Sequence, residues 1–288
     1  MATAPNPDQG ETEFDTGFDG VVRDVTAEEV RSFRKNGWVK LEGLISPELA
    51  AEILRRSKAI MGQDASTISG GGGGDPQFDH YRHILRNYLG AWRVDPFLRT
   101  LSHSAAMGRV ASRLLRDGAV RFLNDEVLVK VPASRGGKPT PYHQDFPHAV
   151  YDRTAMINIW IAIVDIPPAR GSMQFLSGSH HAGPLGRTLL QERDVVEQNP
   201  WLLDDYPLSE RLDMKPGDAT VHGDLTVHGG PANLSDDMRW AYLVNLFDAE
   251  ARYSGGPSYG ENVEGLEVNG LYDTARYPIV HRGGEPRP

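Results

Sequence analysis

The feature that most constrains the fold is that helical and strand patterns occupy different parts of the chain. From about residue 26 to 117 apolar residues mostly recur at helical spacing, whereas from about 119 to 248 short apolar segments alternate with Gly/Pro turns. A parallel doubly wound sheet needs helices between its strands, so this order argues against one. Several strands separated by such turns favour an antiparallel sandwich or barrel. We therefore expect a mainly β protein with flanking helices.

Three segments carry the strongest strand pattern. Residues 126–131, 155–166 and 238–247 read EVLVKV, AMINIWIAIVDI and MRWAYLVNLF. They are rich in the β-branched and aromatic residues that strands favour. Shorter strands are predicted at 172–176 and 219–222, each next to a Gly/Pro turn.

The N-terminal part begins with recognisable helix signals. Residues 1–20 are acidic and polar, which predicts a mobile tail. The run Thr26-Ala27-Glu28-Glu29 fits a capping box that opens a helix. A short strand is predicted at 38–41, and Ser46-Pro47 opens a second helix that runs to about Met61.

We expect a single domain over residues 21–288. Its helical part spans about 26–117, with most of 76–117 helical, and its C-terminal residues 251–288 should form coil. Five consecutive glycines, Gly70 to Gly74, predict a surface loop, with a hinge or lid near a substrate entrance as the functional interpretation.

Composition excludes several classes of protein. The 288 residues include no cysteine, so disulfide scaffolds, Cys-ligated zinc, iron–sulfur clusters and thiol nucleophiles are excluded. Any metal must therefore bind to histidines and carboxylates. The net charge is −9 and no basic stripe is present, which argues against nucleic-acid binding. No segment reaches the roughly 18–20 apolar residues of a membrane span, and the absence of a secretory signal predicts a cytoplasmic protein.

Candidate metal ligands occur in two separated segments. On an extended chain, side chains at i and i+2 point the same way, so His143 and Asp145 can contact one ion. Across an antiparallel sandwich, His228 on a later strand can meet them. Two histidines and one carboxylate on one face of an ion form the facial triad of non-haem Fe(II) oxygenases. The opposite face stays open for a chelating 2-oxo acid and for O₂.

Arg239 lies 239 − 228 = 11 residues after His228 and begins a predicted strand. A guanidinium there could bind the distal carboxylate of 2-oxoglutarate through two hydrogen bonds. A surface arginine on an edge strand would fit the same pattern.

Together these motifs resemble the phytanoyl-CoA dioxygenase family of Fe(II)/2-oxoglutarate oxygenases. The resemblance spans about 120–250 and rests on motifs whose order and spacing match. These are His143-Gln144-Asp145, Trp160 in NIWIAIVDI, Gly171 through FLSGSH to His180, Pro216-Gly217-Asp218, and HGGPAN followed by Arg239. It implies a double-stranded β-helix, a jelly-roll and cupin-like core over about 118–250, with the N-terminal helices packed outside.

The resemblance also implies residue roles. His143, Asp145 and His228 match the iron ligands, and Arg239 matches the anchor of the 2-oxoglutarate carboxylate. Trp160 matches an aromatic position near the co-substrate, with core packing as an equal interpretation. Ser177 stands where the family often has proline before the glycine of its PGSH turn, which puts the stiffness of that turn in doubt.

The remaining histidines are weaker candidates. His222 is the rival for the third ligand, but His228 opens the HGGPAN turn and has the matching distance to Arg239. We expect His222 to be structural or close to the ligands. His148 follows the ligands closely and could line the substrate pocket, whereas His180 and His181 are predicted turn and surface residues.

The resemblance implies oxidation of an unactivated C–H bond with 2-oxoglutarate and O₂ as co-substrates. Family halogenases replace the ligand carboxylate with a small residue, so Asp145 favours hydroxylation. Epimerisation, desaturation and ring closure use the same triad and stay open. A non-catalytic jelly-roll binding protein, a cupin with another metal and a zinc hydrolase stay open as well. We expect a small-metabolite substrate, with tailoring of a secondary metabolite favoured, and a monomer or homodimer.

Overall fold

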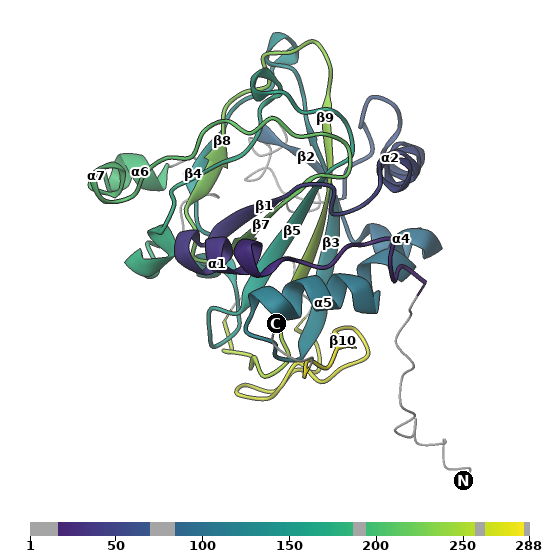
Figure 1. Cartoon of the computed structure of the whole chain (residues 1–288), viewed down its shortest axis with the longest axis vertical. Helices are drawn as coiled ribbons and strands as arrows, with labels where there is room; N and C mark the ends of the chain where they lie inside the picture. Colours follow the sequence, from purple (N-terminus) through teal and green to yellow (C-terminus); the bar gives the residue numbers. More distant parts are fainter. Residues whose placement is uncertain (1–16, 70–83, 187–193, 257–262, 285–288) are drawn as a thin grey trace.

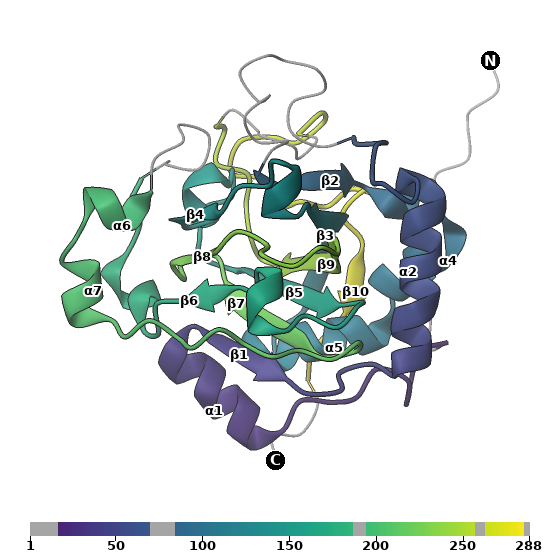
Figure 2. The same cartoon turned by 90° about the horizontal axis from the view of Figure 1, so that it is seen from above.

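The computed structural model describes residues 17–69, 84–186, 194–256 and 263–284. Two antiparallel sheets form its centre (Figures 1 and 2). The larger sheet has the strand order β1-β7-β5-β9-β3-β10, and β2 also pairs with β3. Its strands are β1 (Trp38–Leu41), β2 (Arg86–Leu89), β3 (Val120–Lys130), β5 (Met156–Ala162), β7 (Ala219–Gly223), β9 (Arg239–Asp248) and β10 (Ile279–His281). The smaller sheet has the order β4-β8-β6, formed by β4 (Thr140–His143), β6 (Gln174–Phe175) and β8 (His228–Gly230).

The longer helices precede the long strands β3, β5 and β9 in the chain and pack outside the sheets. They are α1 (Ala27–Asn36), α2 (Pro47–Met61), α4 (Pro96–Ser102) and α5 (Ala105–Leu114). Two short helices, α6 (Val195–Gln198) and α7 (Leu202–Asp205), come between β6 and β7 in the chain. In space they lie to one side of the sheets (Figure 1). The 3₁₀ turns are η2 (Ala91–Arg93), η3 (Ala133–Arg135), η4 (Phe146–His148), η5 (Pro168–Arg170) and η6 (Ser179–Ala182). The predicted jelly-roll core with external helices is confirmed. No helix within the described residues is long and apolar enough to cross a membrane.

Local sequence explains where the first two helices begin and end. Both hydrogen bonds of the predicted capping box at Thr26 are present, and Gly37 ends α1 in the left-handed conformation at φ 80°. The Ser46 side chain accepts from Leu49 N at the start of α2, with Pro47 in the first turn. The predictions for α1 and α2 are therefore confirmed.

The central strands are buried on both faces, and the pleat divides their side chains between two clusters. Ile157, Ile159 and Ile161 of β5 join the core under the helices. Trp160 and Ala162 of the same strand face the smaller sheet. This burial on both sides explains why the segment reads as an almost continuous apolar run.

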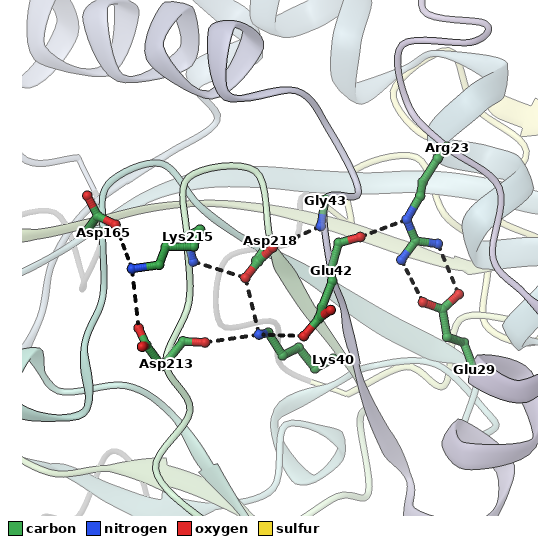
Figure 3. A network of polar contacts seen from close by, with 9 residues as sticks. All are labelled: Arg23, Glu29, Lys40, Glu42, Gly43, Asp165, Asp213, Lys215 and Asp218. Carbon is green, nitrogen blue, oxygen red and sulfur yellow. Dashed lines mark hydrogen bonds and ion pairs between the residues drawn. The ribbon is translucent and has the colours of Figure 1, made fainter.

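A polar network joins the N-terminal layer to the turn before β7 (Figure 3). Asp218 accepts from Gly43 N at 2.9 Å and from Lys215 N at 3.0 Å. The ammonium of Lys40 lies 3.3 Å from the same carboxylate. Exposed ion pairs contribute little on their own, so the Gly43 hydrogen bond is the part that fixes the segment after β1 against the turn, while the Lys215 hydrogen bond holds the turn itself.

Three local predictions were wrong. Arg86–Leu89 forms β2 rather than helix, because it pairs with residues 126–129 of β3. Ile279–His281 forms β10 within the predicted C-terminal coil, again through pairing with β3. Phe18, predicted to lie in the mobile tail, is buried and packs edge-on against Phe97 at 5.6 Å. Residues 1–16 of that tail and Gly70 to Gly74 lie outside the described residues.

Candidate metal and co-substrate site

Two histidines meet where the strands of the smaller sheet pair. His143 ends β4 and His228 begins β8, and the two residues are partners in the register. Each Nδ1 donates to the carbonyl two residues earlier, His143 to Pro141 O at 2.8 Å and His228 to Thr226 O at 3.0 Å. Because a carbonyl can only accept, Nδ1 carries the proton and Nε2 presents its lone pair. Both imidazoles are thus oriented as metal ligands usually are.

Asp145 completes the group from the loop after β4. Its amide N donates to Asp224 O at 3.0 Å, which turns the chain toward the histidines. Asp145 Oδ1 lies 3.6 Å from His143 Nε2, and Oδ2 lies 3.8 Å from His228 Nε2. One donor atom from each residue lies within 4.8 Å of the others. The structure therefore brings together the three residues that the sequence predicts as ligands.

Burial fixes the protonation states of this group. It lowers the pKa of His143 and of His228 to about 4, helped in each case by a neighbouring histidine. Burial alone would raise the pKa of Asp145, but the surrounding histidines outweigh it and hold that pKa below its usual range. Two neutral imidazoles and an ionised carboxylate are the state in which these groups bind a divalent metal.

His222 lies beside the three predicted ligands, but its Nε2 already has a hydrogen-bond partner. Its Nε2 is 3.5 Å from Asp145 Oδ2. The amide nitrogen of Asn158 lies 3.0 Å from that Nε2 and 2.6 Å from Asp145 Oδ2. An amide NH₂ only donates, so His222 Nε2 accepts from it. Sequence reasoning missed Asn158, although a lone polar residue inside the apolar run MINIWIA is a signal that could have found it.

A cavity of about 250 Å³ opens beside the triad between the two sheets. His148, on η4, also lines it, as the sequence suggested, whereas His180 and His181 lie on η6 and do not. The apolar part of its wall consists of Leu85, Leu89, Leu123, Leu128, Ala149, Tyr151, Met156, Trp160, Met173 and Leu243.

Arg239 begins β9 and lines the same cavity, with only 4% of its surface exposed. Its Nη1 donates to Gly171 O at 2.9 Å, and its guanidinium carbon lies 5.0 Å from the centre of the Trp160 ring. Its buried Nε has no hydrogen-bond partner among the described residues. Burial lowers the pKa of Arg239 to about 10, so the side chain stays cationic at neutral pH.

Lys130 is a second buried basic residue, which sequence reasoning missed. It is the register partner of Arg239 on β3 and donates to the carbonyls of Gly230 and Pro231 at 3.2 and 2.8 Å. Burial, with Arg239 next to it, lowers its pKa well below the usual value. Neither side chain forms an ion pair with a carboxylate within the described residues. Uncompensated buried charge is costly, so the cationic Arg239, whose Nε has no partner among the described residues, fits an anion bound in the cavity.

The jelly roll places two histidines and one carboxylate beside a cavity, with the buried Arg239 on the same cavity wall. Together these features define the class of mononuclear non-haem oxygenases. Within it the chain belongs to the phytanoyl-CoA dioxygenase family, whose model matches residues 33–241. The family predicted from the sequence is confirmed, and members of this family are enzymes.

Individual relatives are distant. Phytanoyl-CoA dioxygenase domain-containing protein 1 of Danio rerio is 23% identical over 86% of this chain and 99% of its own length. The carbocyclase SnoK from nogalamycin biosynthesis, a non-haem α-ketoglutarate-dependent enzyme, superposes with a TM-score of 0.72 at 24% identity, over 90% of this chain and 98% of its own. The epimerase SnoN, solved with Fe³⁺, α-ketoglutarate and nogalamycin RO, gives 0.71 at 23% identity over 88% and 98%. At these identities the structural likeness shows a shared fold.

Proposed function

We propose that the protein is an Fe(II)- and 2-oxoglutarate-dependent dioxygenase that hydroxylates an unactivated C–H bond of a small metabolite. Tailoring of a secondary metabolite is the role we favour. The observation that carries this proposal is that one cavity is lined both by the His143, Asp145 and His228 group and by the buried Arg239. A metal-binding group alone fits many proteins. Its combination with a buried guanidinium whose Nε lacks a partner among the described residues fits a chelating dicarboxylate.

His143, Asp145 and His228 would hold the iron through two imidazole nitrogens and one carboxylate oxygen. Three protein ligands on one side leave positions for 2-oxoglutarate and O₂. When bound, the iron supplies the activation of O₂ that is coupled to oxidation of 2-oxoglutarate to succinate and CO₂. The protein orients the ligands through their second ring nitrogens and through the Asp145 backbone.

Arg239 would bind the distal carboxylate of 2-oxoglutarate, and a bidentate guanidinium–carboxylate pair also sets the orientation of the molecule. Trp160 forms the wall beneath the guanidinium. The apolar remainder of the cavity would exclude water while the substrate C–H bond is positioned.

Ring closure or epimerisation is the second candidate. Two structural neighbours are a carbocyclase and an epimerase that use the same co-substrate. These outcomes differ from hydroxylation in the fate of the substrate after hydrogen removal, and product analysis by mass spectrometry separates them. Hydroxylation adds one oxygen atom, ring closure removes two hydrogen atoms, and epimerisation leaves the mass unchanged.

Iron-dependent conversion of 2-oxoglutarate to succinate tests the proposal. Purified protein with Fe(II) should form succinate, slowly without substrate, whereas the zinc-loaded protein should form none. His143→Ala and Asp145→Ala should lower the rate at least about 100-fold with an unchanged circular dichroism spectrum. The exposed His181→Ala is the matched control and should keep the wild-type rate. Full activity in the first two variants, or no succinate from the iron-loaded wild type, contradicts the proposal.

A further inference from the structure

The proposed function leaves one part of the cavity wall without a role. Strands β3 and β9 place Asn124, Glu126 and Asn245 on it. In the register Asn124 is opposite Asn245, and Glu126 is opposite Leu243, which is two residues from Asn245. These side chains therefore share one face of the sheet as direct and diagonal neighbours.

The same register links this group to the metal ligands. Asn245 is also the partner of Asn158 on β5, whose amide donates to Asp145. A polar row thus crosses the sheet from His222 through Asn158 and Asn245 to Asn124. A molecule that contacts Asn245 or Glu126 lies close to the ligand group.

Two acceptor atoms on this wall have no hydrogen-bond donor within the described residues. Asn245 uses its amide nitrogen on Asn124 Oδ1, and its Oδ1 is buried with no partner among the described residues. The Oε2 atom of Glu126 accepts from Asn87 at 3.1 Å, and Oε1 has no protein donor within the described part of the chain. Burial raises the pKa of Glu126, which agrees with a carboxyl that lacks compensation. Buried acceptors without donors are costly, so a ligand that donates hydrogen bonds fits this wall.

The group is separated from the proposed co-substrate anchor. Arg239 lies four residues before Leu243, the partner of Glu126, on β9, which is about 13 Å along an extended strand. The basic end of the cavity therefore suits an anion, and the acceptor end repels one. Leu128 on β3 and Leu243 on β9 give the wall between these two ends an apolar surface.

We propose that Glu126 and Asn245 bind the substrate and determine its class: a compact, largely apolar molecule that presents a hydroxyl or a protonated amine to this wall. Carboxylates and phosphates are excluded from this end of the cavity. The inference rests on the proposed function, because it names the substrate class of the same site. Glu126 is a specificity-determining residue in this account, and Asn245 orients the donor next to the ligand group.

Three probes that share a cyclohexane ring test this assignment: cyclohexylamine, cyclohexanol and cyclohexanecarboxylate. Their binding is measured by ligand-observed NMR on zinc-loaded wild-type protein with saturating 2-oxoglutarate. The amine and the alcohol should bind at least tenfold more tightly than the carboxylate. Equal or tighter binding of the carboxylate overturns the proposal without any variant being needed.

Glu126→Gln assigns the preference to one side chain. The glutamine removes the charge and keeps an acceptor, so amine affinity should fall at least tenfold while alcohol affinity changes less than threefold. The exposed Glu48→Gln is the matched control and should leave all three affinities unchanged. An unchanged amine preference in Glu126→Gln that melts at the wild-type temperature contradicts the assignment.

The two proposals fail separately. Probe binding uses a redox-inert metal and needs no turnover, whereas succinate formation by the iron-loaded wild type needs no probe. Succinate formation with a carboxylate preference removes only the substrate class. Preference for the amine and the alcohol without any succinate formation removes the oxygenase function. In that case the probes no longer stand for a substrate.

Discussion

Arg239 and Lys130 are cross-strand partners, and each is almost completely buried. Within the described residues their hydrogen bonds go to backbone carbonyls, which compensate part of the cost of desolvation. Burial lowers the pKa of Lys130 well below its usual value, whereas Arg239 stays cationic at neutral pH and lines the cavity. Arg239 therefore favours a carboxylate ligand.

Arg239→Ala should raise the KM for 2-oxoglutarate about 10- to 100-fold and change kcat much less. The reason is that charge-assisted hydrogen bonds contribute about 1.5–3 kcal/mol, and each 1.4 kcal/mol is about tenfold in affinity. Initial rates of succinate formation over a 2-oxoglutarate series measure it. Arg55→Ala, on the exposed side of α2, is the control with unchanged KM. An unaltered KM in Arg239→Ala would show that the guanidinium binds no co-substrate.

Residue spacing could find some site residues and not others. His143 and Asp145 stand out because their i, i+2 spacing next to a turn is readable in one segment. Asn158, Lys130 and Glu126 lie inside apolar strands, and whether such a residue faces a cavity or solvent depends on strand register. Register is set by pairing between distant segments, so their positions emerge only from the structure.

Among the elements, the junction of α4 with β3 has a pH-sensitive contact. His103 caps the C-terminal end of α4, and its ring lies 4.0 Å from the Phe122 ring. Burial lowers the pKa of His103 to about 4, against a hydrogen bond to the Arg99 carbonyl that raises it. In the unfolded chain the pKa of His103 is near 6.5, so the unfolded chain binds this proton at a higher pH than the folded protein does. Folding stability from this site therefore falls as pH drops from about 6.5 to 4, by up to about 1.4 kcal/mol per unit.

His103→Gln should remove that pH dependence. The free energy of unfolding, measured in denaturant at pH 7 and pH 5, should differ less between the two pH values than in the wild type. The absolute stability also falls because the ring contact is lost, so only the pH difference is diagnostic. The exposed His181→Gln should keep the wild-type difference. The same pH difference in His103→Gln and wild type would show that His103 does not titrate as described.

Elements with strong local signals were predictable, and short edge strands were not. α1 and α2 begin at capping residues that specify a helix start without tertiary contacts. β2 and β10 have four and three residues and exist because β3 offers hydrogen-bonding partners on that side. Their own sequences carry too little pattern to separate strand from helix or coil.

At the scale of the whole molecule, the N-terminal layer is fastened to the jelly roll at the turn before β7. Gly217 has a φ of 98°, and a Cβ added there would overlap the carbonyl oxygen of Ile45. The Ile45 amide donates to Gly217 O at 3.2 Å. Glycine thus permits the close approach of two segments that are far apart in the sequence.

Gly217→Ala should destabilise the fold by about 1–3 kcal/mol, from the overlap and from the left-handed backbone. Thermal unfolding followed by circular dichroism measures it. Gly136→Ala is the matched control, because Gly136 has a φ of 86° but open space where a Cβ would stand. It should lose less stability. Equal losses in the two variants would show that the approach of Ile45 is not the source of the effect.

The order of the elements made the architecture predictable, since helices that precede strands can only pack outside an antiparallel core. The arrangement of cavity side chains was not predictable to the same degree, because it depends on how two sheets face each other. The proposed site is accordingly geometric: three residues distant in the sequence would hold one iron beside an arginine that would bind a carboxylate.

The most direct test is a crystal structure grown anaerobically with Fe(II) and 2-oxoglutarate, with anomalous data collected at the iron edge. We expect one iron peak bonded to His143 Nε2, His228 Nε2 and the Asp145 carboxylate, with 2-oxoglutarate extending from the iron to Arg239. An iron peak on His222 instead of His228, a peak elsewhere, or no peak at all would contradict it.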